Sequence, residues 1–143
     1  MEPEEILKRY AFSFVGIPYI WGGDDPMKGF DCSGFVIELL KAVGMFPANY
    51  DASAQDMFNH FFNLSTHTPE FGSLVFFGKS MNDISHVAFC LNDKTMIEAG
   101  GGDKSTKDLS SAIDRNAYIR VRPISNRKDV VAYLLPRYEW IYV

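Results

Sequence analysis

In the first half of the chain, apolar residues recur three and four positions apart, which is the spacing of amphipathic helices. The pattern predicts a first helix over residues 3–14, a second from about Cys32 to Gly44, and a third that begins near Ser53. The apolar residues expected to face the core are Ile6, Leu7, Tyr10, Ala11 and Phe14 in the first helix, Phe35, Val36, Leu39, Leu40 and Val43 in the second, and Ala54, Met57, Phe58, Phe61 and Phe62 in the third.

After Pro69 the pattern changes to short apolar or alternating runs, which are typical of strands. The runs SLVFFG, HVAFCL, TMIEA and NAYIRVRPI are each predicted to form a strand, and VVAYLLP and YEWIYV are expected to close the sheet. HVAFCL and TMIEA flank the turn-forming NDK, which predicts a hairpin. Because helices come first and strands second, the predicted fold class is α+β, with N-terminal helices packed on a central antiparallel sheet.

One of the two cysteines, Cys32, lies where the glycine-rich loop in GGDDPMKGFDCSGFVIELL becomes a helix. The start of a helix carries unpaired N–H groups and a partial positive charge, which favour the thiolate form of a cysteine. The same N–H groups can stabilise an oxyanion that forms when a thiolate attacks a carbonyl. This stretch therefore indicates an activated nucleophile, although most free cysteines are small buried hydrophobes.

A cysteine nucleophile needs a base, and the chain has three histidines. His60 and His67 are expected at the surface or at the edge of the core. His86 opens the run HVAFCL, and a rigid strand end is a good place to hold a base. As a lone histidine it could equally be a satisfied core or edge residue.

The register of the predicted hairpin supplies a third group beside His86. If residues 91 and 95 pair across NDK, residues 88 and 98 also pair, and Glu98 becomes the diagonal neighbour of His86 on the same face. Its carboxylate could then accept a hydrogen bond from the imidazole and fix its tautomer. The alternative is an exposed strand glutamate. Cys90 lies on the same face but roughly 13 Å along the strand, so it is expected in the core.

The composition fits one domain over residues 1–143. The chain is 47% hydrophobic, which is enough to bury a single core, and its formal net charge is −4. No basic block is present, so nucleic-acid binding is not expected. The basic residues of the last third are interspersed with acids and are expected to form an ordinary solvated surface; they are Arg115, Arg120, Arg122, Arg127 and Lys128.

Several further classes are not expected from the sequence. Two cysteines cannot build a disulfide framework, although a single Cys32–Cys90 bridge stays open. No paired Cys or His spacing suggests zinc, and no run approaches the roughly 18 apolar residues of a membrane span. The start MEPEEILKRY does not resemble a secretory signal. We therefore expect synthesis in the cytoplasm, and action elsewhere would need another delivery route or a leader that was removed.

The segments GIPYIWGGDDPMKGFDCSGFV, GSLVFF, SHVAFCL and MIEAGGG, in this order, resemble the NlpC/P60 family of cell-wall cysteine peptidases. The resemblance implies a minimal papain-like fold and cleavage of bacterial peptidoglycan stem peptides, often between D-glutamate and a diamino acid such as diaminopimelate. It implies that Cys32 is the nucleophile, that His86 is the general base, and that Glu98 takes the third polar position. No metal or organic cofactor is implied.

The same resemblance implies substrate contacts around the nucleophile. Tyr19 matches the tyrosine that borders the catalytic cysteine, and Asp31 and Ser33 match positions that recognise the free amine of a stem peptide. Trp21 and Ser85 belong to the same motifs and are further candidate contacts. In the segment before the strands, Gln55 and Met57 are candidates to line one wall of the cleft.

The sequence departs from the family pattern at two positions. Glu98 stands where histidine is usual, and it would hold a protonated imidazole more tightly. Ser73 stands where aspartate is usual, and only a local structural change is expected there.

Three functions remain open at this point. The first is a peptidoglycan peptidase, such as a bacterial or phage lysin that acts on the wall after delivery with a phage tail, by lysis or by another export route. The second is a catalytically inactive peptidoglycan-binding module. The third is a thiol amidase or acyltransferase that acts on another substrate. A monomer is favoured, with stem peptides as the binding partner.

Overall fold

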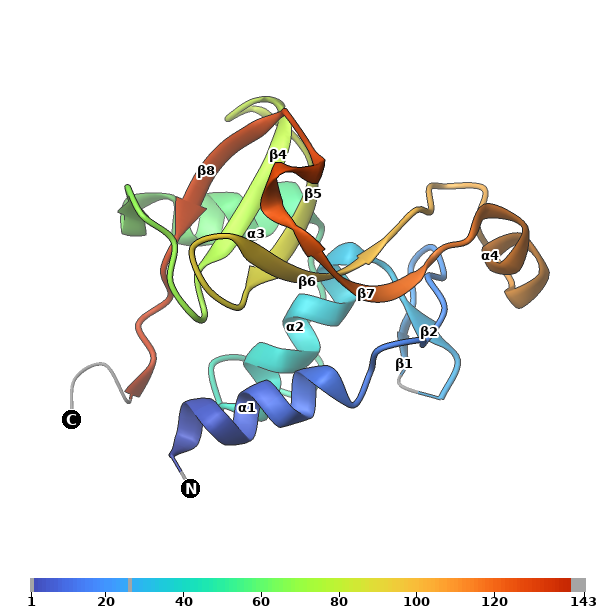
Figure 1. Ribbon diagram of the computed structural model, residues 1–143, viewed down its shortest axis with the longest axis horizontal. Helices are drawn as coiled ribbons and strands as arrows, with labels where there is room; N and C mark the ends of the chain where they lie inside the picture. The colour runs from blue at the N-terminus through green and yellow to red at the C-terminus, as the bar shows by residue number, and fades with distance from the viewer. Residues whose placement is uncertain (1, 26, 140–143) are drawn as a thin grey trace.

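The computed structural model describes residues 2–25 and 27–139, and its main feature is a six-stranded antiparallel sheet with helices on one face (Figure 1). The strand order is β3-β8-β4-β5-β6-β7, and every strand pair is antiparallel. The strands are β3 (Ser65–Thr66), β4 (Leu74–Ser80), β5 (Asp83–Cys90), β6 (Thr95–Gly100), β7 (Tyr118–Pro123) and β8 (Val130–Leu134). The predicted α+β class is confirmed.

The helices precede the large sheet along the chain, except for α4. They are α1 (Pro3–Phe12), α2 (Cys32–Ala42), α3 (Ala54–Phe61) and α4 (Leu109–Arg115), with short 3-10 turns η1 (Phe62–Leu64) and η2 (Ile124–Asn126). A small hairpin, β1 (Asp24–Asp25) and β2 (Gly29–Phe30), leads into α2. In Figure 1, α2 lies between α1 and the sheet, and α4 projects at the far end of the molecule. No helix within the described residues is long and apolar enough to cross a membrane.

Alternation along the strands divides the buried residues into two clusters. On the helix side, Phe76 and Phe89 pack with the buried faces of α2 and α3. On the other side a smaller cluster contains Val75, Phe77 and Cys90. Successive strand residues point to opposite faces, so one sheet serves both clusters. Cys90 is fully buried, as predicted. Cys32 and Cys90 are both free thiols, so the bridge that the sequence left open is not formed.

The predicted helices are present, with corrections at their ends. The helix predicted over residues 3–14 ends at Phe12, because the chain turns before Gly16. Ile6 was expected to face the core but is 54% exposed, and Phe62, which lies in η1 beyond the end of α3, is 63% exposed. Helix α3 begins as expected, because Ser53 and Asp56 form a reciprocal capping box.

The predicted strands are also present, but β5 is longer than expected. It begins at Asp83, so His86 lies inside the strand and does not open it. In the final run YEWIYV, Tyr138 and Glu139 are not in a strand, and residues 140–143 lie outside the described residues. Helix α4, the β1–β2 hairpin and the short β3 were not predicted, because their periodic segments are too short to identify.

Candidate active site

Cys32 is the first residue of α2, and the residue before it caps the helix. The Asp31 side chain accepts hydrogen bonds from the backbone N–H of Gly34 at 2.7 Å and of Gly22 at 3.1 Å. A side chain at Gly34 would collide with the carbonyl of Gly23, so the close approach of loop and helix requires glycine. Loop, cap and helix thus hold the half-buried thiol of Cys32 at the positive end of α2.

His86 is buried, and its ring is held between Cys32 and Glu98. Its Nε2 lies 3.3 Å from the Glu98 Oε1, and the ring lines the same cleft as Cys32, whose proximity raises the pKa of the imidazole. Because Nε2 is engaged by the carboxylate, Nδ1 is the ring nitrogen left to face the thiol. The predicted contact between His86 and Glu98 is therefore present. It follows from the expected register, since Leu91 donates to the Thr95 carbonyl and Phe89 pairs with Ile97.

The surroundings of His86 favour its charged form. Burial lowers the pKa of the imidazole, but hydrogen bonds and charges from Cys32 and Glu98 outweigh it and raise the pKa to about 9. For Glu98, burial raises the pKa of the carboxyl, and the contact with His86 together with Arg122 and Arg127 brings it below its ordinary value. The two groups therefore form a buried ion pair over the neutral pH range.

Tyr19 lies beside this group and is held by backbone contacts. Its N–H donates to the Ala117 carbonyl at 3.0 Å, and its ring is 5% exposed. The pKa of its hydroxyl is raised, first by burial and then by the negative charges of Cys32 and Asp31. The ring packs against Gly102, where any side chain would collide with it. The glycine run after β6 therefore makes room for Tyr19.

A cleft of about 190 Å³ opens at these side chains. Its lining includes five predicted site residues: Tyr19, Cys32, Ser85, His86 and Glu98. It also includes Arg122, Asn126 and Arg127, together with residues 99–102. The prediction that Arg122 and Arg127 form an ordinary solvated surface is therefore wrong. Arg120 and Arg122 of β7 point to the same face of the sheet as Glu98 of β6, so the strand periodicity places Arg122 on the Glu98 face, although it does not show that Arg122 lines the cleft.

The other candidate contacts lie outside the lining of this cleft. Trp21 is 46% exposed, and Ser33 is buried and donates to the cap Asp31 at 3.3 Å. Met57 is fully buried in the core, and the Gln55 side chain bonds to the backbone of Met81 and Ile84. The predicted roles of Gln55 and Met57 in a cleft wall are therefore wrong. His60 and His67 are exposed, as expected.

Ser73, which stands where the family usually has aspartate, makes hydrogen bonds with the backbone. Its side chain accepts from the Glu70 N–H at 3.0 Å, and its carbonyl accepts from the Cys90 N–H at 2.8 Å. Ser73 is buried, so its hydroxyl stabilises the turn that leads into β4. This is a local structural role, as expected.

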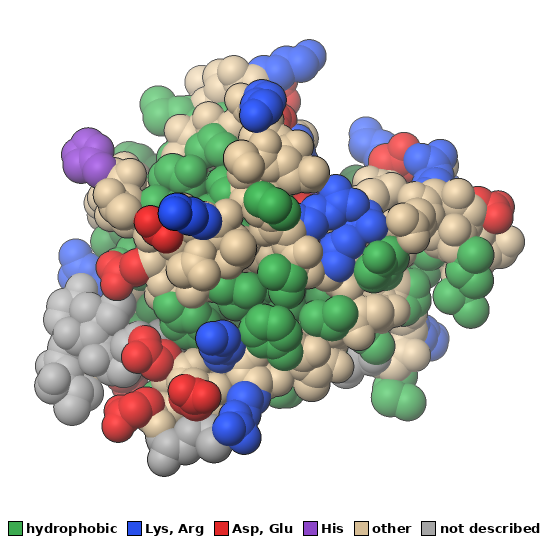
Figure 2. Space-filling model, viewed as in Figure 1, with side chains coloured by type: hydrophobic (Ala, Val, Ile, Leu, Met, Phe, Trp, Pro, Cys, Tyr) green, Lys and Arg blue, Asp and Glu red, His purple; other side chains and the backbone are tan. Residues whose placement is uncertain are grey.

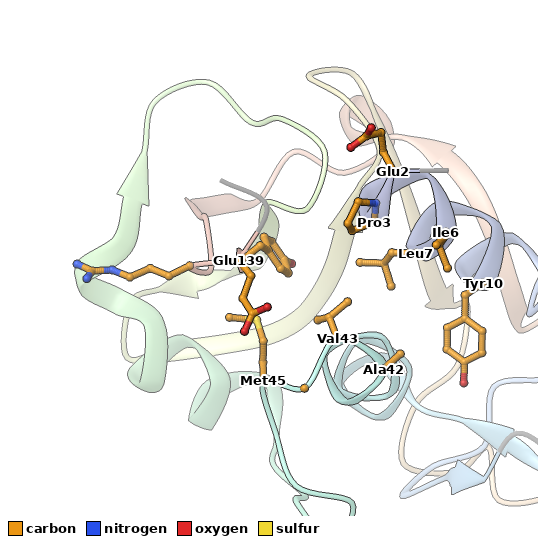
Figure 3. A pocket seen from close by; sticks show the side chains of 12 residues that line it. Glu2, Pro3, Ile6, Leu7, Tyr10, Ala42, Val43, Met45 and Glu139 are labelled. Carbon is orange, nitrogen blue, oxygen red and sulfur yellow. The ribbon is translucent and has the colours of Figure 1, made fainter. Parts of the chain in front are cut away.

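A larger cavity of about 870 Å³ lies between α1, the end of α2 and the segment that follows β8 (Figure 3). Its described lining is mostly apolar, with Ile6, Leu7 and Val43 among the contacts, and includes neither cysteine nor histidine. Volume alone does not make a catalytic site, and the smaller cleft holds the reactive groups. Within residues 2–25 and 27–139, no three His, Cys, Asp or Glu side chains come together as a metal site requires.

We compared the sequence of this chain with models of known protein families. The model described as "NlpC/P60 family" matches residues 16–123, which is most of the chain and contains Cys32, His86 and Glu98. The chain belongs to the NlpC/P60 family. This match confirms the resemblance drawn from the sequence motifs.

Curated relatives of this NlpC/P60 chain are longer proteins. It is 30% identical over 118 residues to the bifunctional muramidase/DL-endopeptidase CwlT of Bacillus subtilis, covering 81% of this chain and 35% of that protein. It is 31% identical over 109 residues to the gamma-D-glutamyl-L-lysine dipeptidyl-peptidase of the same species, covering 75% and 35%. The chain therefore spans about a third of the length of these two relatives.

Solved structures share the fold. An NlpC/P60 family protein from Bacillus cereus superposes with a TM-score of 0.72 at 21% identity, covering 96% of this chain and 40% of that one. The P60 domain of an antigen from M. avium subspecies paratuberculosis gives a TM-score of 0.65 at 27% identity and covers 95% of both chains. These neighbours confirm the papain-like architecture that the family resemblance implied.

Proposed function

We propose that this chain is a cysteine peptidase that hydrolyses amide bonds in peptidoglycan stem peptides. The observation that carries the proposal is that Cys32, at the start of α2, shares one cleft with a buried His86–Glu98 pair. A nucleophile, a base and a group that orients the base are the minimum for thiol-dependent acyl transfer. Family membership supports the same reaction class.

The reaction proceeds in two steps. In the first, the Cys32 thiolate attacks the amide carbonyl, and the helix-start N–H of Cys32 and the hydroxyl of Tyr19 stabilise the oxyanion. His86 then gives its proton to the departing nitrogen, so the C–N bond breaks and a thioester remains on Cys32. In the second, neutral His86 takes a proton from water, the resulting hydroxide equivalent attacks the thioester, and the acid leaves while the Cys32 thiolate and the protonated His86 are restored.

Within this sequence of steps, Glu98 holds the ring of His86 and stabilises its charged form. Its side chain is 4% exposed, and its Oε1 contacts Nε2 of His86, so it acts on the ring of His86 and not on the substrate carbonyl. Burial strengthens the attraction between two opposite charges. Glu98 is thus a positioning residue that keeps Nδ1 directed at Cys32.

The bond we propose is the one between D-glutamate and the following diamino acid. Two relatives support it by their names, one a DL-endopeptidase and the other a gamma-D-glutamyl-L-lysine dipeptidyl-peptidase. Both relatives are longer than this chain, so the assignment of this bond to the present protein is a proposal that the following experiment tests.

The test is digestion of the defined tripeptide L-Ala-γ-D-Glu-meso-diaminopimelate, followed by chromatography and mass spectrometry. We expect release of L-Ala-D-Glu by the wild-type protein and no release by Cys32→Ala, which leaves the fold intact. Cys90→Ala is the matched control, because it removes a buried thiol on the opposite side of β5 from the helices and keeps activity.

Three outcomes would contradict the proposal. Turnover by Cys32→Ala would exclude the thiol mechanism. Binding of the tripeptide without cleavage by the wild-type protein would favour a binding module. Cleavage at a different bond would favour an amidase of another specificity.

A further inference from the structure

The wall of the cleft that carries His86 also carries an arginine with no acidic partner. Arg122 lies opposite Met96 across the β6–β7 pair, so its side chain shares the sheet face of Glu98. It is half-buried and lines the cleft with Cys32 and His86. Within the described residues it makes no ion pair and no side-chain hydrogen bond, and its charge acts on Glu98 from a distance.

The second arginine of this wall, Arg127, already has an acidic partner. Arg127 donates twice to the Asp129 carboxylate, at 2.9 and 2.7 Å, and its guanidinium lies 4.7 Å from the centre of the Phe77 ring. Its charge is therefore matched and its position is held. Among the charged side chains of the cleft, Arg122 is therefore the cation without an ion-pair partner in the described part of the chain. Figure 2 shows Lys and Arg side chains gathered in a compact cluster over the region where β7 lies in Figure 1.

The chemistry of the reaction decides which part of a substrate this charge faces. His86 delivers a proton to the departing nitrogen, so the residue that supplies this nitrogen must lie over the wall that carries His86. That wall is built from β5, β6, β7 and η2, and it presents Arg122 and the exposed residue Asn126.

We propose that Arg122 binds a carboxylate on the residue that supplies the leaving amine, with the Asn126 side chain as a second donor. The proposal rests on the proposed function and extends it to substrate choice. A planar guanidinium with free donors matches a carboxylate in geometry and charge. In a stem peptide this carboxylate has two sources, the side-chain carboxylate of a diamino acid such as diaminopimelate or the C-terminal carboxylate of the peptide.

The experiment compares three tripeptides, L-Ala-γ-D-Glu-meso-diaminopimelate, its side-chain carboxamide and its C-terminal amide. With the wild-type protein we expect kcat/KM to fall roughly ten- to a hundredfold for the amide that removes the recognised carboxylate, the range of one charge-assisted hydrogen bond. The amide that causes the fall identifies the source. With Arg122→Gln this preference disappears, and the recognised substrate loses the same factor while its amide does not.

Two variants separate recognition from other effects. Lys128→Gln removes the same charge from an exposed residue outside the cleft, so it reports the influence of net charge alone and keeps the preference. Arg122→Lys keeps the charge and recovers part of the preference, which a folding defect in Arg122→Gln would not predict. Equal losses on all three peptides with Arg122→Gln, together with a shifted pH–rate profile, would overturn the proposal, because Arg122 would then act only through Glu98 and His86.

A binding measurement keeps this proposal distinct from the proposed function. Titration calorimetry with Cys32→Ala measures the affinity for each tripeptide without turnover. Tighter binding of the free carboxylate supports recognition by Arg122 even if the wild-type protein cleaves none of the peptides, a result that would refute only the proposed function. Equal affinity for all three, or no binding, overturns the proposal for Arg122 whatever the turnover.

Discussion

Replacing Glu98 with glutamine tests the buried pair at the centre of the site. The substitution keeps the shape and the acceptor oxygen, and it removes only the negative charge beside the His86 ring. The pKa of His86 is about 9 in the folded protein, against 6.5 for an unperturbed imidazole. This difference corresponds to about 3 kcal/mol in favour of the charged ring.

The contribution of Glu98 to the raised pKa of His86 follows from the causes of that rise. Burial acts against the charge, so Cys32 and Glu98 together supply more than the net amount. If the two contribute evenly, Glu98→Gln lowers the pKa of His86 by at least about 1, or about 1.4 kcal/mol. The alkaline limb of the activity profile then moves to lower pH by the same interval, because the proton that His86 gives to the departing nitrogen is lost earlier.

The direct assay is an NMR titration of the His86 ring protons in wild-type protein and in Glu98→Gln. The exposed His60 and His67 provide internal reference signals, and Glu4→Gln, a loss of the same charge on the exposed side of α1, is the control variant. An unchanged His86 midpoint in Glu98→Gln would refute the reasoning, since the carboxylate would then contribute nothing to the charged ring.

The His86–Glu98 pair also makes the unfolding free energy depend on pH, in a direction that the two pKa shifts determine. The folded-state pKa of His86 is raised, so its stabilisation is complete below about pH 6.5 and is lost as the pH rises through about 9. The folded-state pKa of Glu98 is lowered, so its stabilisation is present above the ordinary value of 4.5 and is lost as the pH falls further. Chemical denaturation should therefore show a larger loss of unfolding free energy for Glu98→Gln at pH 6 than at pH 10, and equal losses would contradict this account.

Two further substitutions test how the site is built. Asp31→Ala removes the cap of α2 and should lower the unfolding free energy by about 1 kcal/mol, measured by urea denaturation, and an unchanged midpoint would argue against the cap. Gly102→Ala places a methyl group against the Tyr19 ring and should reduce kcat/KM on the stem tripeptide while circular dichroism stays native, and full activity would show that the ring can move freely.

Much of the site could be predicted because its geometry is local. Cys32 begins a helix because a glycine-rich loop and the cap Asp31 precede an apolar run with helical spacing. Glu98 meets His86 because a short turn sets the hairpin register, and the period of two then places both side chains on one face. Short-range periodicity and turn length are sufficient for both inferences.

The errors have an equally clear origin. Ile6 follows the helical period of its neighbours but is 54% exposed, because no element among the described residues covers that part of α1. Met57 was predicted both to face the core, from its helical spacing, and to line one wall of the cleft, and it lies in the core. Periodicity indicates which face of an element is apolar, but it does not indicate what packs against that face.

Local patterns in the chain were sufficient to predict the class of fold, the start of the nucleophile helix and the His86–Glu98 pair, since each depends on residues close together along the chain. The surroundings of the cleft, by contrast, depend on how the folded elements pack. This packing brings Tyr19 against Gly102, and it turns Arg122 and Arg127 from apparent surface charges into cleft residues. These contacts join segments about eighty or more residues apart in the chain, or depend on the path of the chain through η2. They arise from the packing of whole elements, which no local pattern of residues specifies.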